Sequence, residues 1–294
     1  MRVVTTKPEL REALAGARRE GQAIGLVPTM GWLHGGHVSL LEAARRDCDV
    51  VVMSLFVNPA QFGADEDLDR YPRDGDRDVA IAAAAGVDLV YAPAAGDVYP
   101  PGFATSVEVE GLTEVLCGSP GRRGPDHFRG VTTIVAKLLN SVGPDVAYFG
   151  QKDAQQAVVI RRMVTDLDFP VRIEVLPTVR EADGLAMSSR NAYLAPADRE
   201  RAPALHRALR AAAGSAQPGA MVDDALAAAR EELARAGVEA EYLEARDAGD
   251  LTPVEAFNGR PVLIAVAARV GNARLIDNVV VEPAAEQTER QEPR

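Results

Sequence analysis

Lysine is almost absent from this chain, and cysteine, tryptophan and long apolar runs are scarce as well. Of the 32 basic residues only Lys7, Lys137 and Lys152 are lysines, so a compact ammonium group at any of these positions stands out. The two cysteines, Cys48 and Cys117, are too few for a disulfide framework and favour a reducing compartment. No segment approaches the roughly 20 apolar residues of a membrane span, and the N-terminus lacks the apolar core of a signal peptide. We therefore expect a cytoplasmic protein with no membrane partner.

Basic residues as a whole are fewer than acidic ones, 32 against 43. The formal net charge of the 294 residues is -11 and the isoelectric point is near 5.0. An acidic surface argues against nucleic acid as a partner, because nucleic-acid binding requires a basic face. An apolar fraction of 47% and a charged fraction of 26% suit a globular enzyme with one large domain or two.

The most informative stretch covers residues 24–46. A short apolar run bounded by proline predicts a buried strand, and the segment from His37 onward predicts a helix. Between them lies a loop with three glycines and with His34 as a second histidine. A helix start has free N–H groups and a partial positive charge, so this loop suits a phosphate group. The His-x-Gly-His pattern is typical of enzymes that attack the α-phosphate of a nucleoside triphosphate. A zinc site is the alternative, but no third ligand follows nearby.

Polar side chains also follow the next buried strand. Residues 50–57 form a continuous run of the kind buried on both faces in a parallel sheet, and Asn58 and Gln61 come directly after it. Ligands of such sheets gather beyond the carboxyl ends of the strands. We therefore expect both amides near the histidine loop.

A second strand-to-helix corner follows a predicted strand at residues 145–149. It carries Lys152, Asp153 and Gln156. Because this corner lies at the same edge of the sheet, the three side chains are expected beside the histidine pair.

A third polar segment, residues 178–191, follows a predicted strand at residues 171–176. Two hydroxyls and a guanidinium, from Ser188, Ser189 and Arg190, form a multi-donor phosphate clamp.

Three further segments of the first half carry weaker expectations. Residues 65–78 are acidic and are read either as a solvated charge run or as part of the site. Residues 106–110 are predicted to form a short strand. Residues 116–130 form a long turn-rich loop before a helix at residues 131–142, and loops of this length tend to be functional.

Two domains and a tail are expected. Residues 1–182 alternate strands and helices, which predicts an α/β domain with a Rossmann-like parallel sheet that binds the nucleotide. Residues 183–283 place helices before strands, which predicts a separate, smaller α+β domain. Residues 284–294 are polar and are expected to be disordered.

Four motifs follow one another in the order found in pantothenate synthetases, also called pantoate/beta-alanine ligases, and the chain resembles this family. The resemblance runs from Pro28 to Leu194 and returns at residues 274–278. The motifs are Pro28-Thr29-Met30-Gly31 with His34-x-Gly36-His37, Phe56-Val57-Asn58-Pro59-x-Gln61-Phe62, Phe149-Gly150-x-Lys152-Asp153-x-Gln155-Gln156 and Asp183-Gly184-Leu185-Ala186-Met187-Ser188-Ser189-Arg190-Asn191.

The resemblance implies a fold and an activity. It implies a nucleotidyltransferase-type sheet domain, a smaller C-terminal α+β domain and a homodimer. The family joins (R)-pantoate to beta-alanine, with ATP as co-substrate and Mg²⁺, and releases AMP and pyrophosphate through a pantoyl adenylate.

The resemblance also assigns residues to the site. Those expected to contact ATP are Met30, Gly31, Trp32, Leu33, His34, Gly35, Gly36, His37, Gly150, Gln151, Lys152, Asp153, Val179, Met187, Ser188, Ser189 and Arg190. Those expected around pantoate are Gln61 and Gln156, with Pro28, Met30, Asn58 and Phe62. The expected catalytic set supplies hydrogen bonds and positive charge to the α-phosphate and consists of His37, His34, Lys152, Ser188, Ser189 and Arg190. In the family, the residue at the position of His37 acts as a proton donor.

The chain departs from the family pattern in two places. Trp32 and Gly35 stand where the family commonly has Ala and Glu. The loop with Arg122 and Arg123 is longer and reordered, which leaves open which of the two arginines faces phosphate.

The metal ligands and the base are not determined by the sequence. Arg77 and Ile81 occupy positions where Mg²⁺ contacts would be sought, while Asp76 and Asp78 remain candidates; no protein ligand is assigned. The base that deprotonates the amine could be His37, the adenylate phosphate or solvent.

Two other classes of function compete with the ligase. A nucleotidyltransferase of the same fold would act on a small phosphorylated acceptor and would favour basic residues there, where this chain has Gln61 and Gln156. A nucleotide sensor without catalysis would have no need for two imidazoles at the α-phosphate.

Overall fold

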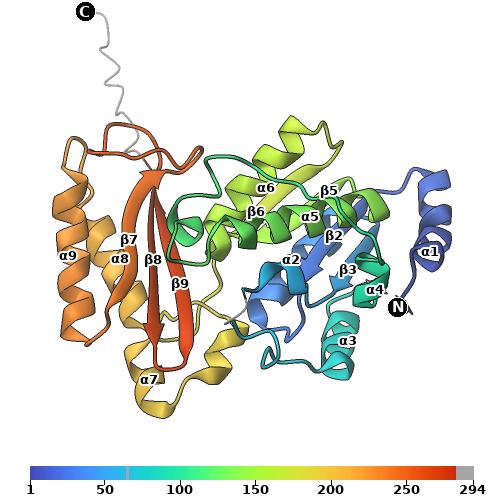
Figure 1. Cartoon of the computed structure of the whole chain (residues 1–294), viewed down its shortest axis with the longest axis horizontal. Helices are drawn as coiled ribbons and strands as arrows, with labels where there is room; N and C mark the ends of the chain where they lie inside the picture. The colour runs from blue at the N-terminus through green and yellow to red at the C-terminus, as the bar shows by residue number, and fades with distance from the viewer. Residues whose placement is uncertain (64–65, 283–294) are drawn as a thin grey trace, which may run out of the picture.

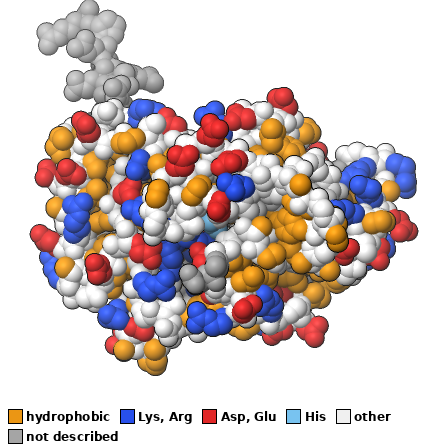
Figure 2. All heavy atoms as spheres, in the orientation of Figure 1, with side chains coloured by type: hydrophobic (Ala, Val, Ile, Leu, Met, Phe, Trp, Pro, Cys, Tyr) orange, Lys and Arg blue, Asp and Glu red, His pale blue; other side chains and the backbone are white. Residues whose placement is uncertain are grey.

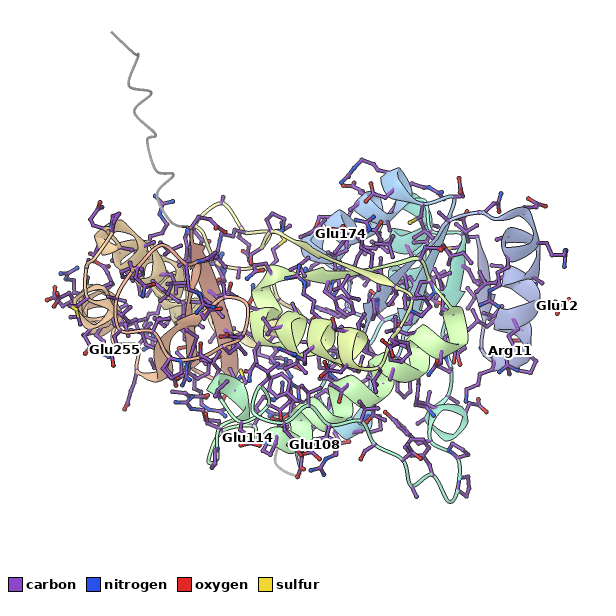
Figure 3. The ribbon with its side chains drawn as sticks, turned by 90° about the horizontal axis from the view of Figure 1, so that it is seen from above. Arg11, Glu12, Glu108, Glu114, Glu174 and Glu255 are labelled. Carbon is purple, nitrogen blue, oxygen red and sulfur yellow. The ribbon has the colours of Figure 1, made fainter. Side chains whose placement is uncertain are left out.

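Two sheets lie side by side in the computed structural model, which describes residues 1–63 and 66–282 (Figure 1). Arg11 and Glu12, on the first helix, lie at one end of the molecule, and Glu255 lies at the other (Figure 3). The expected disordered tail falls outside the described residues. Within those residues, no helix has the length and apolar character needed to cross a membrane.

The first sheet has six strands, all parallel. They are β1 Arg2–Val4, β2 Ile24–Thr29, β3 Val50–Leu55, β4 Leu89–Tyr91, β5 Val146–Gly150 and β6 Arg172–Leu176. Their order is β1-β4-β3-β2-β5-β6. From β2 the chain builds outward through β3 and β4, and then it returns to add β5 and β6 on the other side. The carboxyl ends of β2 and β5 therefore flank a topological switch point, where ligands of such sheets bind.

Helices cover both faces of this sheet. They are α1 Lys7–Glu20, α2 Gly35–Asp47, α3 Gly75–Ala84, α4 Ala95–Val98, α5 Pro125–Val142 and α6 Ala154–Asp166, with short 3₁₀ turns η1 Pro59–Gln61, η2 Leu116–Gly118 and η3 Gln151–Asp153. Leu26 packs in the core on the α1, α5 and α6 face, while its neighbour Val27 packs with α2 and α3. Successive side chains of a strand point to opposite faces of the sheet. Because helices cover both faces, every position of the strand is buried, which explains the continuous apolar runs.

The second sheet is antiparallel and belongs to the C-terminal part of the chain. Its strands are β7 Ala240–Asp247, β8 Val262–Val270 and β9 Ala273–Val281, and they follow η4 Ser189–Tyr193, α7 Pro196–Arg201, α8 Ala204–Ser215 and α9 Val222–Arg235. Along β8, Ile264 and Val266 pack with α8 and α9, whereas Leu263 and Ala265 join the core that contains α5 and α6. This strand is buried on both faces because it lies between its own helices and the first half.

The α/β fold class with a smaller α+β part is confirmed, but one predicted element is wrong. Residues 106–110 do not form a strand. Instead, the backbone of Val107 is hydrogen-bonded to threonine side chains of α5. Its N–H donates to Thr133 Oγ1 at 3.0 Å and its carbonyl accepts from Thr132 Oγ1 at 2.6 Å. Because side chains of a helix satisfy these backbone N–H and C=O groups, the segment needs no neighbouring strand.

Two helices begin earlier than the sequence indicated. The second helix starts at Gly35 rather than at His37, and α5 starts at Pro125 rather than at residue 131. A proline in the first turn of a helix is compatible with helical backbone, because its missing N–H has no partner there anyway. The long loop before α5 is shorter than expected for this reason.

Candidate active site

The loop after β2 is shaped by a buried carboxylate from α3. Asp78 is 1% exposed and accepts the backbone N–H groups of Trp32 and Leu33, both at 2.7 Å. Gly31 and Trp32 have φ angles of 86° and 52°, and a positive φ is costly for tryptophan. Two charge-assisted hydrogen bonds offset that cost. The sequence left Asp78 as a candidate Mg²⁺ contact. In the structure both of its carboxylate oxygens accept hydrogen bonds from the loop.

The two departures from the family pattern in this loop have neighbours that accommodate them. The guanidinium of Arg77 lies 5.0 Å from the centre of the Trp32 ring and donates to the carbonyl oxygen of Leu33 at 2.9 Å. A side chain at Gly35 would meet Met187, because a Cβ there would lie 2.9 Å from its sulfur. Trp32 is thereby stacked on Arg77, and the missing side chain at Gly35 leaves room for Met187.

The two histidines lie at the N-terminus of α2 with their rings 4.1 Å apart. His34 Nδ1 accepts the N–H of Gly36 at 3.1 Å, and His37 Nδ1 accepts the N–H of His34 at 3.3 Å. Since each Nδ1 is an acceptor, the proton of each neutral ring is on Nε2. Each ring can therefore donate a hydrogen bond without being charged.

Both imidazoles are neutral at pH 7. Burial, assisted by the positive charge of Lys152, lowers the pKa of His34 to about 4. Burial, assisted by His34, holds the pKa of His37 well below its usual value. Fixed positive charge in the site consequently comes from Lys152, from Arg190 and from the start of the helix.

The turn η3 after β5 carries the lysine. Lys152 Nζ lies 3.2 Å from Asp153 Oδ2. This turn occupies the end of the strand next to β2, as the sequence pattern predicts. Lys152 therefore faces the histidine loop across the switch point.

Arg190 is paired with a carboxylate from the first half of the chain. Its Nε and Nη2 donate to the two oxygens of Asp67 at 3.0 and 2.9 Å, and its guanidinium lies over the Tyr71 ring. Burial acts to raise the pKa of Asp67, but the hydrogen bond and charge of Arg190 outweigh it and keep the pKa below its usual value. Tyr71 in turn donates to Ser189 at 3.4 Å. The acidic stretch is thus partly built into the site.

Gln61 is held by a network behind it. Asn58 is buried and donates through Nδ2 to Gln61 Oε1 at 2.9 Å and to the Gly130 carbonyl at 3.0 Å. Tyr99 donates to the other side of Asn58 at 2.7 Å. Because the side-chain oxygen Oε1 of Gln61 accepts from Asn58, the Nε2 group of Gln61 is free to donate to other partners.

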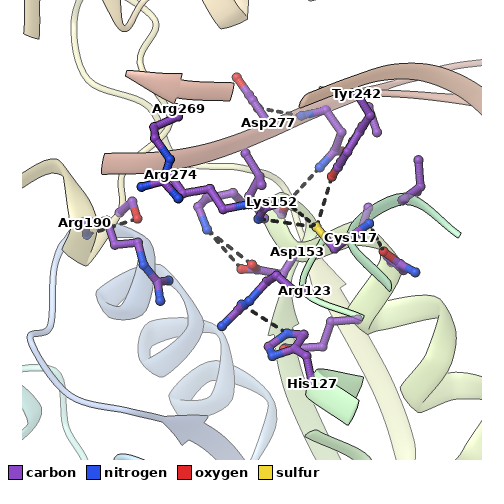
Figure 4. A pocket seen from close by; sticks show the side chains of 18 of the residues that line it. Cys117, Arg123, His127, Lys152, Asp153, Arg190, Tyr242, Arg269, Arg274 and Asp277 are labelled. Atoms are coloured by element: carbon purple, nitrogen blue, oxygen red, sulfur yellow. Dashed lines mark hydrogen bonds and ion pairs between the residues drawn. The ribbon is translucent and has the colours of Figure 1, made fainter. Parts of the chain in front are cut away.

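Two adjoining cavities collect these side chains. The histidine cavity, of about 220 Å³, contains both imidazoles. Figure 2 shows a hollow in the middle of one face, where a histidine is visible beside Lys and Arg side chains. The interface cavity, of about 160 Å³, lies between the two halves (Figure 4). The residues that line both are Lys152, Asp153, Gln156, Ser188 and Arg190.

Most predicted site residues line the histidine cavity. They are Pro28, Met30, His34, Gly36, His37, Gln61, Gly150, Lys152, Asp153, Gln156, Val179, Met187, Ser188, Ser189 and Arg190. The predicted residues that line neither cavity are Gly31, Trp32, Leu33, Gly35, Gln151, Asn58 and Phe62.

The residues outside the cavities have other contacts. The side chain of Leu33 is fully buried in the core beneath the loop. Asn58 is used to orient Gln61, and Gln151 donates to Asn278 at 3.2 Å. Phe62 packs edge-on against Tyr71. These side chains shape the walls from behind.

The lengthened loop contributes Arg123 rather than Arg122 to a cavity. Arg122 pairs with Glu244 on β7 at 2.8 Å, while Arg123 lines the interface cavity and lies 3.2 Å from His127 (Figure 4). Burial, assisted by Arg123, lowers the pKa of His127 to about 3. Sequence reasoning pointed to this loop by its length but did not separate the two arginines.

An apolar wall of the histidine cavity was missed from the sequence. It comes from α5 and consists of Val131, Ile134, Val135 and Leu138. Their helical spacing indicates only a buried face, and which ligand or core that face meets depends on the packing of α5.

Comparisons with known proteins agree with one another. The chain matches the Pantoate-beta-alanine ligase family over residues 2–280. It is 56% identical to the pantothenate synthetase of Moorella thermoacetica over 284 residues, which cover 96% of this chain and 99% of the relative. The solved pantothenate synthetase from Thermus thermophilus superposes with a TM-score of 0.90 at 49% identity, covering 96% of this chain and all of that one.

A second solved relative was crystallised with ligands. It is the pantoate-beta-alanine ligase from Francisella tularensis, complexed with beta-gamma ATP and beta-alanine, and it superposes with a TM-score of 0.79 at 32% identity. The alignment covers 97% of this chain and 99% of that one. Sequence and fold match over nearly the whole length, so the chain belongs to the pantoate-beta-alanine ligase family and is an enzyme of pantothenate formation.

Proposed function

We propose that the histidine cavity binds ATP and (R)-pantoate together and forms a pantoyl adenylate, which beta-alanine then converts to pantothenate. The observation that carries this proposal is the composition of one cavity. Neutral imidazole donors and a lysine line the same space as the amides of Gln61 and Gln156. The Francisella relative, solved in complex with beta-gamma ATP and beta-alanine, supports ATP as co-substrate.

The first step needs charge stabilisation rather than a base. The carboxylate of pantoate is ionised at neutral pH, so its oxygen attacks the α-phosphorus directly. The bond from the α-phosphorus to the bridging oxygen breaks, and pyrophosphate leaves with the electron pair. The Nε2–H groups of His34 and His37 and the ammonium of Lys152 donate to the phosphate oxygens as charge builds. Losing one such donor costs about 10²- to 10³-fold in rate.

Pantoate is recognised by amides and by apolar side chains. Gln61 directs its Nε2 group away from Asn58, so it can donate to the carboxylate or the hydroxyl of pantoate. Gln156 supplies the second amide. The methyl groups of pantoate pack against Met30 and the α5 wall, which includes Val131 and Leu138.

In the second step the amine attacks the acyl carbon, AMP leaves and the nitrogen gives up a proton. An alkyl ammonium is only about one part in 10³ free base at pH 7, a handicap of roughly 4 kcal/mol. His37 is a poor base for this proton, because Nδ1 accepts from the His34 backbone and burial lowers its pKa. We assign the proton to the phosphate of AMP or to solvent, with His37 as a hydrogen-bond donor.

Mg²⁺ is proposed to enter with ATP. Within residues 1–63 and 66–282 no group of three or more His, Cys, Asp or Glu is arranged to hold a metal ion. Asp67 and Asp78 are engaged with Arg190 and with backbone N–H groups. The ion is therefore assigned to the phosphates of ATP and to water.

The remaining features are proposals from the sequence. Residues 183–283 are proposed to close over residues 1–182 and to keep water from the adenylate, with Ser188 and Ser189 on the closing segment. A homodimer and a cytoplasmic location are proposed on family resemblance and on cysteine content. Sedimentation of the purified protein tests the dimer.

Purified protein with Mg²⁺, ATP, (R)-pantoate and beta-alanine tests the reaction. We expect stoichiometric AMP and pantothenate, and we expect a hydroxylamine-trappable pantoyl adenylate when beta-alanine is left out. Lys152→Ala should slow adenylate formation at least 100-fold. Absence of pantoate-dependent AMP would refute the proposal, and a stable nucleotidyl product on a phosphorylated acceptor would favour a nucleotidyltransferase.

A further inference from the structure

Asp277 and Asn278 are two buried polar residues on β9, in the part of the chain that follows the proposed nucleotide-binding half. They are 3% and 4% exposed. They belong to residues 274–278, where the family resemblance returns, and they have no part in the chemistry described above. A buried carboxylate and a buried amide are costly unless they are hydrogen-bonded. Both find their partners in the two segments that carry the phosphate-facing side chains.

Asn278 holds the lysine turn. Its Nδ2 donates to the backbone carbonyls of Gln151 and Lys152, both at 2.9 Å. Its Oδ1 accepts from the side chain of Gln151 at 3.2 Å. One amide therefore fixes two successive carbonyls of η3 and with them the direction in which Lys152 leaves the backbone.

Asp277 holds the segment that leads to the serines. Its two oxygens accept from Arg180 Nη1 and Nη2 at 2.6 and 2.9 Å. Arg180 also donates to the Gly184 carbonyl at 3.1 Å and forms a β-bridge with Ala186. Next to this bridge the N–H of Met187 donates to the carbonyl of Val179 at 3.0 Å. The ion pair thus fixes the base of the loop that presents Met187 and the serines to the cavity.

We propose that Asp277 and Asn278 form a positioning clamp for the adenylation step. Both line the interface cavity but not the histidine cavity, and Figure 4 shows Asp277 on its strand at this cavity. The clamp ties two walls of the ATP site to one strand of the small sheet. A shift of β9 relative to the parallel sheet moves both walls together. This inference rests on the proposed function and adds residues that act through Lys152 and the serine loop.

Asn278→Asp tests the lysine arm of the clamp. The aspartate has the same shape but cannot donate to the two carbonyls of η3. We expect pantoate-dependent exchange of labelled pyrophosphate into ATP to fall by about 10- to 100-fold, because a displacement of about 1 Å costs rates of this order. The KM for pantoate should change less than threefold, since Gln61 and Gln156 are not held by the clamp. Asp277→Asn should slow exchange in the same way through Arg180.

Asp247→Asn is the matched control. Asp247 is also 3% exposed in the small sheet, where it accepts from the Gly249 N–H at 2.8 Å and pairs with Arg260 at 2.8 Å. It lines neither cavity. We expect a lower Tm but an exchange rate within twofold of the parent. Equal slowing by Asp247→Asn, or an unchanged rate in Asn278→Asp, overturns the clamp.

A double variant separates positioning from general destabilisation. If Asn278 acts through Lys152, Asn278→Asp should slow a Lys152→Ala enzyme little further, because the group being positioned is gone. Independent, additive losses overturn the proposal.

Hydrogen exchange of the unliganded protein gives a result that does not depend on catalysis. Asn278→Asp should speed amide exchange in residues 150–154, and Asp277→Asn should do so in residues 178–190, relative to Asp247→Asn. Unchanged exchange in both segments overturns the clamp. A parent protein without pantoate-dependent pyrophosphate exchange would instead refute the proposed function, while the hydrogen exchange still decides the clamp.

Discussion

At the scale of single residues, burial decides the charge of the histidine pair. His34 and His37 point their Nδ1 atoms at backbone N–H groups and lie beside Lys152, so the uncharged form is favoured. A neutral ring can donate from Nε2 to a phosphate oxygen while its Nδ1 continues to accept a backbone N–H. The sequence indicated hydrogen-bond donors to phosphate here but did not indicate their protonation state.

The pH dependence of stability tests the state of His34. Its pKa is about 4 in the folded protein and about 6.5 when unfolded, so between these values the unfolded chain binds more protons. Stability is therefore lost as the pH falls. From pH 7 to pH 5 the free energy of unfolding should drop by about 2 kcal/mol through this residue alone. Urea unfolding of the parent and of His34→Gln measures it, and the variant should lose about 2 kcal/mol less over the same interval. Equal pH slopes for the two proteins would contradict the assignment.

At the scale of elements, the contact between α5 and η1 positions an amide of the site. Asn58 bridges Gln61 and the carbonyl of Gly130, and α5 approaches η1 so closely that a Cβ at Gly130 would lie 2.0 Å from the Ala60 carbonyl oxygen. Helix α5 also forms the apolar wall of the histidine cavity. One packing contact thus sets both the polar and the apolar side of the proposed pantoate site.

Gly130→Ala should disturb this contact. The added methyl group must push η1 away, which costs about 1–3 kcal/mol of stability. We expect the KM for pantoate to rise at least tenfold and the KM for ATP to change less than threefold. Gly16→Ala is the control: Gly16 lies inside α1, where a Cβ meets nothing within 4 Å, and alanine should stabilise that helix by about 0.5–1 kcal/mol. A parallel rise in both KM values would argue against a local effect at the pantoate site.

At the scale of the whole molecule, ion pairs join the two halves around the site. Arg190 binds Asp67, Arg180 binds Asp277, and Arg122 reaches Glu244 on the small sheet. Partly buried charge-assisted pairs of this kind fix orientation more than they add stability. Of these three arginines, Arg190 lines both cavities, and its partner Asp67 lies more than one hundred positions away in the sequence.

Asp67 is expected to compete with ATP for Arg190. Asp67→Asn weakens the existing pair and removes a negative charge near the proposed phosphate site, and both effects favour ATP. The KM for ATP should fall by about 3- to 10-fold, equivalent to about 1 kcal/mol. Asp69→Asn, an exposed neighbour with the same change in charge, should alter it less than twofold. A higher KM for ATP in Asp67→Asn would show that the pair assists binding instead.

The sequence predicted the positions of candidate site residues best where they follow directly after a strand. The histidine loop, Gln61, Lys152 and the serine segment all follow strands of the parallel sheet, and such strand ends meet at one edge. It gave no indication of side chains that turn inward or meet a remote partner. Leu33 is buried beneath its loop, and the strand expected at residues 106–110 is absent because Thr132 and Thr133 bind its backbone.

Strand periodicity, loop glycines and motif order are local properties of the chain, and they were enough to indicate the fold class, the family and the residue types proposed for the site. The folded chain was needed to show the neutral state of His34, the use of Asp78 to shape the loop, and the link from Asp277 and Asn278 to two walls of the cavity. Each of these depends on burial or on contacts between residues tens to more than one hundred positions apart. Such contacts form only when the whole chain has packed.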